Sequence, residues 1–331
     1  MTLAGRGREL VDVALEASVV GSFSRVGFAA RRALFHWDAA PAVDLSGRVA
    51  LVTGATGGIG LATARALAAQ GAEVWIVGRD AGRTEAARQQ IVSATPGAGV
   101  STIVADLCVL NDVRRCAETV ERGSARLDVL VHNAGALAPR LQYTGDGIEV
   151  TAQVHVIAPF LLTSRLLARL QATAGARVIT VSSGGMYTQP LDLSELAQPR
   201  VPFKGARVYA NAKRAQVVLN DLWARRPASD GVTFHAMHPG WADTPGVQES
   251  LPRFRALMRP LLRTPEQGAD TVAWLAGSAA AGATNGAFWL DRGRRLTNRV
   301  PWTRTPEAAA RNLWDWCAAR AGIDVELGVL R

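Results

Sequence analysis

A chain of 331 residues with 48% hydrophobic residues and a formal net charge of +9 has enough apolar material for a large core without disulfide or metal support. Its three cysteines, Cys108, Cys116 and Cys317, form no CxxC motif and no Cys/His cluster, which argues against a disulfide framework and against a metal site. Arg supplies almost all of the positive charge, and no aromatic-basic motif of the nucleic-acid-binding modules occurs, so we expect no nucleic-acid partner.

Residues 1–45 form an N-terminal extension before the main pattern begins. Val11, Leu15, Val19, Phe23 and Val26 recur at helical spacing with charges between them, which predicts an amphipathic helix or a helix pair. We expect this apolar stripe to pack on the main domain or on a partner subunit, with peripheral membrane contact as the alternative. No signal sequence and no uninterrupted apolar run of membrane-spanning length is apparent, so a cytoplasmic protein is expected, with membrane association as the alternative.

From residue 46 to residue 300, short β runs alternate with helical segments. The expected strands are Val49–Thr53, Glu73–Val77, Val100–Val104, Val129–His132, Arg177–Val181, Val232–Met237 and Ala287–Leu290. The expected helices are Ile59–Gln70, Arg83–Ala94, Asn111–Arg122, Ile148–Gln171, Val208–Arg226 and Pro265–Gly277. This alternation predicts an α/β fold, a single doubly wound parallel sheet with helices on both faces. Residues 301–331, with a helix over Pro306–Ala321, are expected to form a helical tail packed on that domain.

A glycine-rich turn follows the first expected strand and opens the first helix. Its sequence from Thr53 to Gly60 is TGATGGIG. Glycines permit a tight turn, and the backbone N–H groups at the start of the helix form a site for a phosphate anion. In this βαβ context the turn predicts a dinucleotide site. The expected contacts are Gly54, Thr56, Gly58, Ile59 and Gly60.

The end of the second strand bears on the choice between NAD and NADP. Arg79 stands there, where an acidic residue would bind the ribose 2′-hydroxyl and an arginine would accommodate a 2′-phosphate. The alternative is an ordinary surface arginine paired with Asp80. We interpret Arg79 as a phosphate contact and expect NADP(H) to be favoured over NAD(H).

Turn residues follow three further strands and should line the same crevice. The ends of parallel strands meet at one edge of an open α/β sheet, where ligands bind. The residues concerned are Asp106, Leu107, Asn133, Gly135, Pro239 and Gly240.

The proton chemistry is expected after the fifth strand and on the following helix. Tyr209 and Lys213 have the i, i+4 spacing that places both on one helix face, and Ser183 follows the strand. A cation beside a phenol favours its ionised form and lets it exchange a proton near neutral pH. Lys213 is one of only two lysines, the other being Lys204, in a chain that otherwise uses arginine.

These motifs occur in one order over residues 47–245, and in that order the sequence resembles the short-chain dehydrogenase/reductase family. The segments around Ser183, Tyr209 and Pro239 are similar in particular to the branch of dehydrogenase/reductase member twelve, a relative of the retinol dehydrogenases. The resemblance implies a single Rossmann-type domain in which Tyr209 acts as acid and base and Ser183 orients the carbonyl. It also implies that Lys213 holds the nicotinamide ribose.

The same resemblance implies two further assignments near the cofactor. Thr244, after the Pro-Gly turn, is expected among the cofactor contacts, as are Tyr209 and Lys213 themselves. The helix between the fourth and fifth strands in this family usually carries an Asn that binds a water of the proton relay, and here His155 aligns with it. His155 can bind water or a carbonyl as Asn does, and a packing role is the alternative. An imidazole titrates near neutral pH, so an additional titrating group is expected there if His155 takes part.

These features predict an NADP(H)-dependent oxidoreductase that interconverts an alcohol and a carbonyl. The segment after Pro239 is rich in apolar residues, and as a cover over the site it would favour a lipophilic substrate. Those residues are Trp241, Leu251, Phe254, Leu257, Met258 and Leu261. The alternative is a cofactor-binding regulatory protein, or a membrane-peripheral scaffold, with little turnover. Oligomerisation is compatible with either interpretation.

Overall fold

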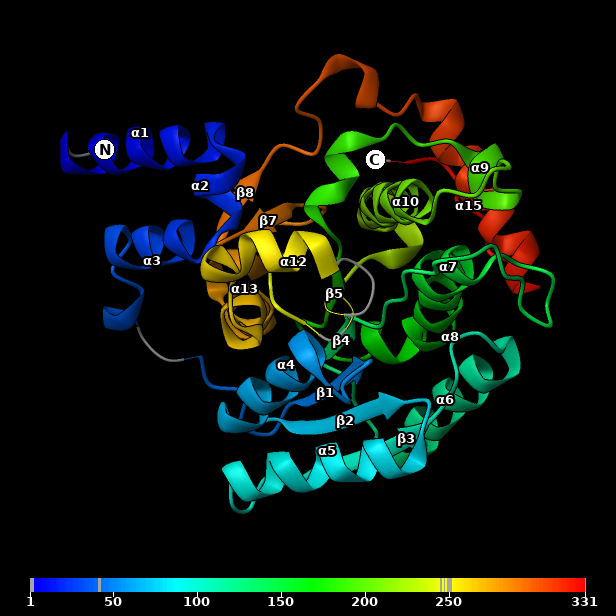
Figure 1. The fold of residues 1–331 in the computed structure, drawn as a ribbon. Coiled ribbons are helices and arrows are strands. Elements are labelled where there is room, and N and C mark those ends of the chain that lie inside the picture. Colours follow the sequence, from blue (N-terminus) through cyan, green and yellow to red (C-terminus); the bar gives the residue numbers. More distant parts are fainter. Residues whose placement is uncertain (1–2, 41–42, 245, 247, 249–251, 331) are drawn as a thin grey trace.

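The computed structural model describes residues 3–40, 43–244, 246, 248 and 252–330, and its centre is one eight-stranded sheet (Figure 1). The strands are β1 (Val49–Thr53), β2 (Glu73–Gly78), β3 (Val100–Val104), β4 (Val129–His132), β5 (Arg177–Val181), β6 (Thr233–Met237), β7 (Phe288–Leu290) and β8 (Gly293–Arg295). Their order is β3-β2-β1-β4-β5-β6-β7-β8, and only β8 runs antiparallel to its neighbour. The expected doubly wound, mostly parallel sheet is confirmed.

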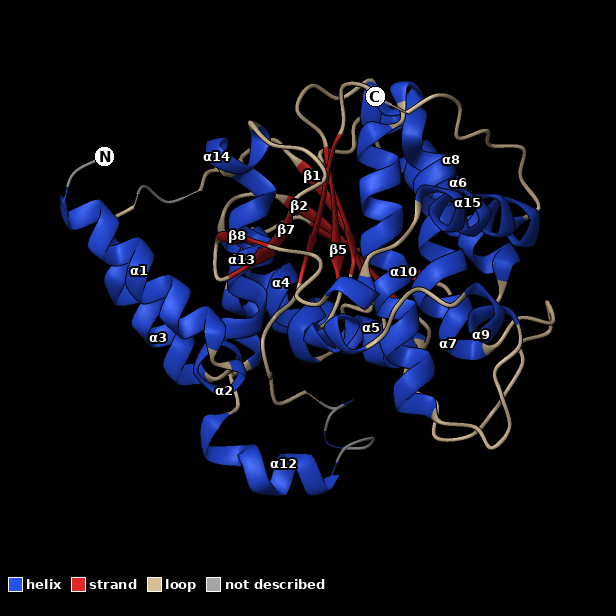
Figure 2. Cartoon of the chain, turned by 90° about the horizontal axis from the view of Figure 1, so that it is seen from above, coloured by secondary structure: helices blue, strands red, loops and turns tan. Residues whose placement is uncertain are grey.

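Helices cover both faces of this sheet, which Figure 2 shows nearly edge-on between two helical layers. One layer consists of α4 (Gly58–Ala69), α5 (Ala81–Ala94) and α13 (Pro265–Gly277). The other consists of α6 (Leu110–Gly123), α8 (Ala158–Gln171), α10 (Gly205–Arg225) and α15 (Glu307–Ala321). Every residue of β1, β4 and β5 is buried, as strands covered on two faces require.

Several short elements were not predicted. They are β8, α9 (Leu193–Ala197), α12 (Pro252–Met258) and α14 (Ala279–Gly282). Each is too short to show a hydrophobic period in the sequence. Strand β8 depends on its ladder with β7, in which Trp289 pairs with Arg294. A pair of arginines carries no local signal for a strand, so only the tertiary pairing defines it.

One helix stands out for its apolar character. α7 (Val150–Ala152), the π-helical turn η2 (Gln153–Ile157) and α8 follow one another without a break, within the expected helix Ile148–Gln171. The resulting 22-residue helix is long and apolar enough to cross a membrane by length and composition. It contains His155 and Arg165, so it is not an uninterrupted apolar run. The helix packs inside the protein against α6 and α15, and 72% of its most apolar window is buried.

The N-terminal extension folds into α1 (Leu3–Ala17), α2 (Val19–Phe23) and α3 (Arg25–Leu34), which lie beside β8 (Figure 1). It docks through charged groups. Arg31 is fully buried, and its guanidinium donates to Asp12 at 2.6 Å and to Asp291, in the β7–β8 turn, at 2.8 Å. The predicted stripe packs on the main domain only in part, since Phe23 is 5% exposed whereas Val11 and Val26 are 48% and 56% exposed. A helical period in the sequence identifies an apolar stripe. It does not identify a charged face that docks, because the residues that pair with those charges lie at the other end of the chain.

Candidate active site

The backbone of the glycine turn between β1 and α4 leaves no room for a side chain at two of its glycines. Gly54 has φ +65°, and a Cβ there would lie 2.7 Å from Cα of Ala134. A Cβ on Gly60 would lie 2.2 Å from the carbonyl oxygen of Gly54. The Asn133 amide donates to the carbonyl oxygens of Thr53 and Gly54 at 3.0 and 3.1 Å, which fixes the turn against the end of β4. The first N–H groups of α4 therefore start at a rigid turn, which fits the pyrophosphate of a dinucleotide.

Arg79 lies directly after β2, and its side chain is exposed. Within the described ranges no ion pair engages Arg79. The Asp80 carboxylate instead accepts the backbone N–H of Arg83 at 2.8 Å and caps α5. The methyl group of Thr56 lies 2.4 Å from where a Cβ on Gly78 would be, so the turn also adjoins the end of β2. This arrangement fits a nucleotide that carries a phosphate beside Arg79.

The remaining expected cofactor residues gather at the same sheet edge, because β1 to β6 are parallel and paired in register. These are Asp106, Leu107, Asn133, Gly135, Pro239, Gly240 and Thr244. The Asp106 carboxylate accepts the N–H of Cys108 at 2.9 Å. Gly240 has φ +72°, and a Cβ there would meet the carbonyl oxygen of Phe23 at 2.6 Å. The extension thus touches this edge, which sequence reasoning did not predict.

The two serines after β5 have different partners. The Ser182 hydroxyl is buried and donates to the carbonyl oxygen of Lys213 at 2.9 Å, so it joins β5 to α10. The Ser183 hydroxyl accepts the N–H of Gly185 at 3.2 Å, and its interaction with the Tyr209 phenol lowers the pKa of that phenol. Ser183 is therefore the serine that faces the phenol.

Tyr209 and Lys213 meet on one face of α10. The Lys213 ammonium lies 5.5 Å from the centroid of the Tyr209 ring and donates to the carbonyl oxygen of Val181 at 2.9 Å. Burial raises the pKa of Tyr209, and a hydrogen bond from Ser183 lowers it in part. Burial also lowers the pKa of Lys213 to about 7. The expected lowering of the Tyr209 pKa is therefore not met by the protein chain by itself, because desolvation outweighs the nearby cation.

His155 lies in the π-helical turn η2, and its ring meets Tyr209 edge-on with centroids 5.3 Å apart. Its Nε2 lies 3.0 Å from the N–H and 2.8 Å from the carbonyl oxygen of Ala136, so the tautomer decides which bond forms. A Cβ on Gly135 would lie 2.9 Å from this ring. Burial and then the Lys213 charge hold the pKa of His155 well below its ordinary value. The expected titration of His155 near neutral pH is therefore wrong.

A small cavity of about 20 Å³ lies behind His155, close to the volume that one water needs. Polar atoms of four residues at its wall lack a protein partner: Nδ1 of His132, Nδ1 of His155, Oε1 of Gln216 and Nδ2 of Asn220. His132 packs at the end of β4, with Nε2 2.7 Å from the Thr163 hydroxyl. Sequence reasoning missed Gln216 and Asn220, although they continue the helical spacing that starts at Tyr209 and Lys213.

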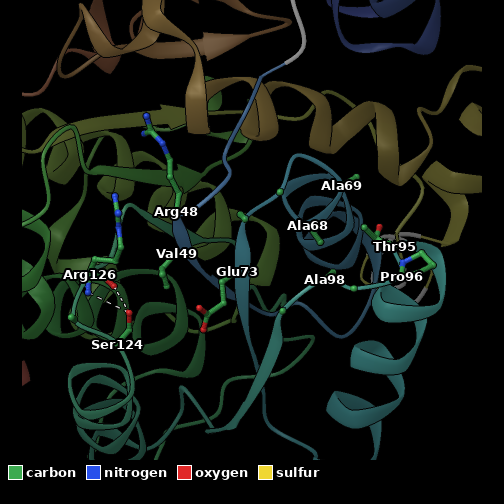
Figure 3. A pocket seen from close by; sticks show the side chains of 16 residues that line it. Arg48, Val49, Ala68, Ala69, Glu73, Thr95, Pro96, Ala98, Ser124 and Arg126 are labelled. Atoms are coloured by element: carbon green, nitrogen blue, oxygen red, sulfur yellow. Dashed lines mark hydrogen bonds between the residues drawn. The ribbon is translucent and has the colours of Figure 1, made fainter.

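An open cavity of about 640 Å³ lies at the opposite, amino-terminal ends of β1 and β2 (Figure 3). Two of its charged side chains, Arg126 and Glu73, have partners within the protein. Arg126 pairs with Asp128 at 2.6 Å, and Glu73 accepts the indole N–H of Trp75 at 2.7 Å. Over the described residues no cluster of metal-ligating side chains occurs, here or elsewhere. This cavity is separate from the sheet edge that carries the expected site.

A doubly wound sheet with a glycine turn, and with serine, tyrosine and lysine at its carboxyl edge, defines a nicotinamide-dependent oxidoreductase. The family model of short chain dehydrogenases matches residues 48–253. The chain belongs to the short-chain dehydrogenase/reductase family. It is 41% identical over 252 residues to human dehydrogenase/reductase SDR family member 12, covering 76% of this chain and 78% of that protein. It is 30% identical to mouse retinol dehydrogenase 11, covering 86% and 89% respectively.

Solved structures agree with this assignment. The Pseudomonas aeruginosa RhlG complex with NADP matches with a TM-score of 0.61 and 29% identity, covering 74% of this chain and 94% of that chain. The 3-ketoacyl-(acyl-carrier-protein) reductase of Brucella melitensis, complexed with NADH, matches with a TM-score of 0.59 and 25% identity, covering 74% and 96%. These neighbours support a nicotinamide cofactor of either kind.

Proposed function

We propose that this protein uses NADP(H) to interconvert an alcohol and a carbonyl, with Tyr209 as the acid and base. The observation that carries the proposal is the cluster in which the Tyr209 ring centroid lies 5.5 Å from the Lys213 ammonium, beside Ser183, which lowers the pKa of the phenol. The three groups come from the end of β5 and from α10, at the sheet edge that bears the glycine turn. Tyr209→Phe is the direct test, because it removes the proton of the phenol and should abolish most turnover while cofactor binding is kept.

In the direction of reduction, the bound nicotinamide supplies the hydride to the carbonyl carbon. The Ser183 hydroxyl donates to the carbonyl oxygen and holds it near Tyr209. The Tyr209 phenol then gives its proton to that oxygen, and Lys213 stabilises the resulting phenolate and binds the nicotinamide ribose. In the direction of oxidation the same atoms move in reverse, with the Tyr209 phenolate accepting the proton of the alcohol.

NADPH should bind more tightly than NADH because of Arg79. A charge-assisted contact to a 2′-phosphate contributes roughly 1.5–3 kcal/mol, so Arg79→Ala should weaken NADPH binding by about 10- to 100-fold and leave NADH unchanged. Fluorescence titration of both cofactors measures this. Arg65→Ala, an exposed arginine on α4, is the matched control and should change neither affinity. If the parent binds NADPH and NADH with equal affinity, and if Arg79→Ala changes neither affinity, the NADP preference is contradicted.

A lipophilic substrate is supported by the segment that follows β6. Trp241 and Phe254 are half-buried, with ring centroids 5.5 Å apart, and Leu257 on the same helix α12 is 79% exposed. Met258 and Leu261 are partly exposed. Leu251 lies outside the described residues. Apolar side chains of this kind beside the expected nicotinamide site favour an apolar alcohol or carbonyl over a sugar.

We propose that His155 takes the place of the usual Asn in the proton relay, through Ala136 and the small cavity behind the ring. An Asn amide can bond both the N–H and the carbonyl oxygen of Ala136, so His155→Asn should keep turnover within about tenfold of the parent. His155→Leu should lose turnover by about 100-fold, since it leaves buried polar groups unmet. Steady-state kinetics of both variants, with NADPH affinity as control, decide this. If His155→Leu turns over as fast as the parent, His155 is only a packing residue.

A second role, contact with a membrane surface, is favoured by one observation on the extension. Leu10, Val13, Val19 and Val20 are between 47% and 70% exposed, so α1 and α2 present apolar groups to solvent. We expect the protein to float with anionic vesicles, and Leu10→Glu/Val13→Glu to abolish flotation while retaining NADPH binding. If the parent does not float with the vesicles at low salt and stays in the bottom fraction of the gradient, this role is excluded.

A further inference from the structure

The N-terminal extension reaches the segments that carry the reacting groups. Phe23, the last residue of α2, is buried, and its ring lies 2.7 Å from where a Cβ on Gly184 would be. Gly184 directly follows Ser183. The carbonyl oxygen of Phe23 accepts the N–H of Trp241 at 2.8 Å, in the segment after β6. One residue of the extension therefore contacts the chain on both sides of the expected substrate position.

Three aromatic rings continue from Phe23 along this side of the site. Phe23 and Trp241 meet edge-on with ring centroids 5.9 Å apart, and Trp241 and Phe254 do so at 5.5 Å. Phe23 is buried, whereas Trp241 and Phe254 are half-buried and retain apolar surface. Edge-to-face packing gives such a row a defined geometry. We call Phe23, Trp241 and Phe254 the aromatic wall.

Buried charges fix the position of Phe23. The Arg263 guanidinium donates to the Phe23 carbonyl oxygen at 3.0 Å, and it also binds both carboxylate oxygens of Asp291. Arg31 of the extension binds the same carboxylate at 2.8 Å, and all three side chains are at most 1% exposed. Removal of one partner leaves a buried charge uncompensated, which is strongly unfavourable. The extension is therefore held in one position relative to the catalytic residues.

We propose that the N-terminal extension is part of the substrate site: through Phe23 it builds an aromatic wall beside Ser183 that binds the apolar tail of the substrate. The proposal rests on the proposed oxidoreductase function and adds to it the residues that select substrates by tail length. Trp241 contacts the tail, and Phe23 is a positioning residue that holds Trp241 and the Ser183–Gly184 backbone.

Binding of 1-decanol and 1-butanol to the NADPH-loaded protein, measured by calorimetry, tests this without requiring turnover. Each buried methylene adds up to about 0.8 kcal/mol, so burial of two to three of the additional methylenes of decanol gives the parent a preference of about 30-fold. Trp241→Ala should reduce this preference by about tenfold and Phe23→Leu by about threefold. Phe35→Leu is the control, because Phe35 is a ring of the extension that is 38% exposed at the end of α3. It should leave the preference unchanged.

A parent that does not prefer decanol would overturn the proposal, and so would a preference that all three variants change equally. Trp241 is half-buried, so Trp241→Ala keeps the test decisive if Phe23→Leu does not fold. Failure here is separate from failure of the proposed function. NADPH affinity and the loss of turnover in Tyr209→Phe depend on the glycine turn and the phenol, not on the aromatic wall.

Discussion

Tyr209→Phe should reduce kcat by about 10³-fold while NADPH binds as it does to the parent. General acid catalysis by a positioned group contributes about 10²–10⁴-fold, and Phe keeps the ring but has no proton to give. The phenol is the group whose pKa Ser183 lowers, so its loss also removes that interaction. The expected phosphate site is formed by Gly54 in the turn after β1 and by Gly60 in the first turn of α4, and we expect its affinity for NADPH to stay within about twofold.

Single-turnover kinetics with a saturating cofactor separate these two effects. Tyr143→Phe is the control, since Tyr143 is 48% exposed and is one of only three tyrosines in the chain. It should leave kcat unchanged. If Tyr209→Phe retains turnover within tenfold of the parent, another group is the acid, and the assignment of Ser183 and Lys213 fails with it.

The sheet could be predicted from the sequence because its signals are local. Each buried parallel strand appears as a short apolar run, and glycine or asparagine marks its end. The turn at Gly54 is identified by residue type, since only glycine accommodates φ +65° beside Ala134. The π-helical turn at His155 has no such signal, because it depends on how η2 packs against α10 and the Ala136 backbone.

The catalytic cluster could be predicted for the same reason, and the extension could not. Tyr209 and Lys213 are four residues apart on one helix, so their meeting follows from helix geometry. Arg31 and Asp291 are 260 positions apart, and nothing local indicates that they pair. The apolar stripe indicated only part of the docking face, since charge pairing rather than apolar burial joins α1 to β8.

The group that titrates near neutral pH also differs from the expected one. An imidazole has an ordinary pKa in that range, which made His155 the natural candidate. Full burial removes His155 from the range, and the same burial brings the pKa of Lys213 down to about 7. Desolvation disfavours the charged form of both side chains, and the structure supplies no carboxylate among the causes to offset it for Lys213.

Lys213→Met should therefore make the cofactor-free protein more stable while it loses turnover by at least about 100-fold. The folded pKa of Lys213 lies below its unfolded value of 10.5, so the buried ammonium destabilises the fold. This cost is complete below pH 7, falls as the pH rises from 7 to 10.5, and is absent above that range. Met removes the charge at similar length. The carbonyl oxygen of Val181 loses its partner at the same time, which offsets roughly 1–3 kcal/mol of the gain.

We expect a net gain of about 1–3 kcal/mol in the free energy of unfolding at pH 6, disappearing between about pH 8 and 9 because the cost falls by about 1.4 kcal/mol per pH unit above pH 7. Urea denaturation of parent and variant from pH 6 to about pH 10 measures it. Lys204→Met, whose lysine precedes α10 and is exposed, should show no such pH dependence. A variant that is less stable than the parent at pH 6 would mean that Lys213 is held as a stabilising cation. The buried charge of Lys213 would then not destabilise the fold. The expected result instead describes a lysine kept at a cost to the fold because hydride transfer beside Tyr209 requires it.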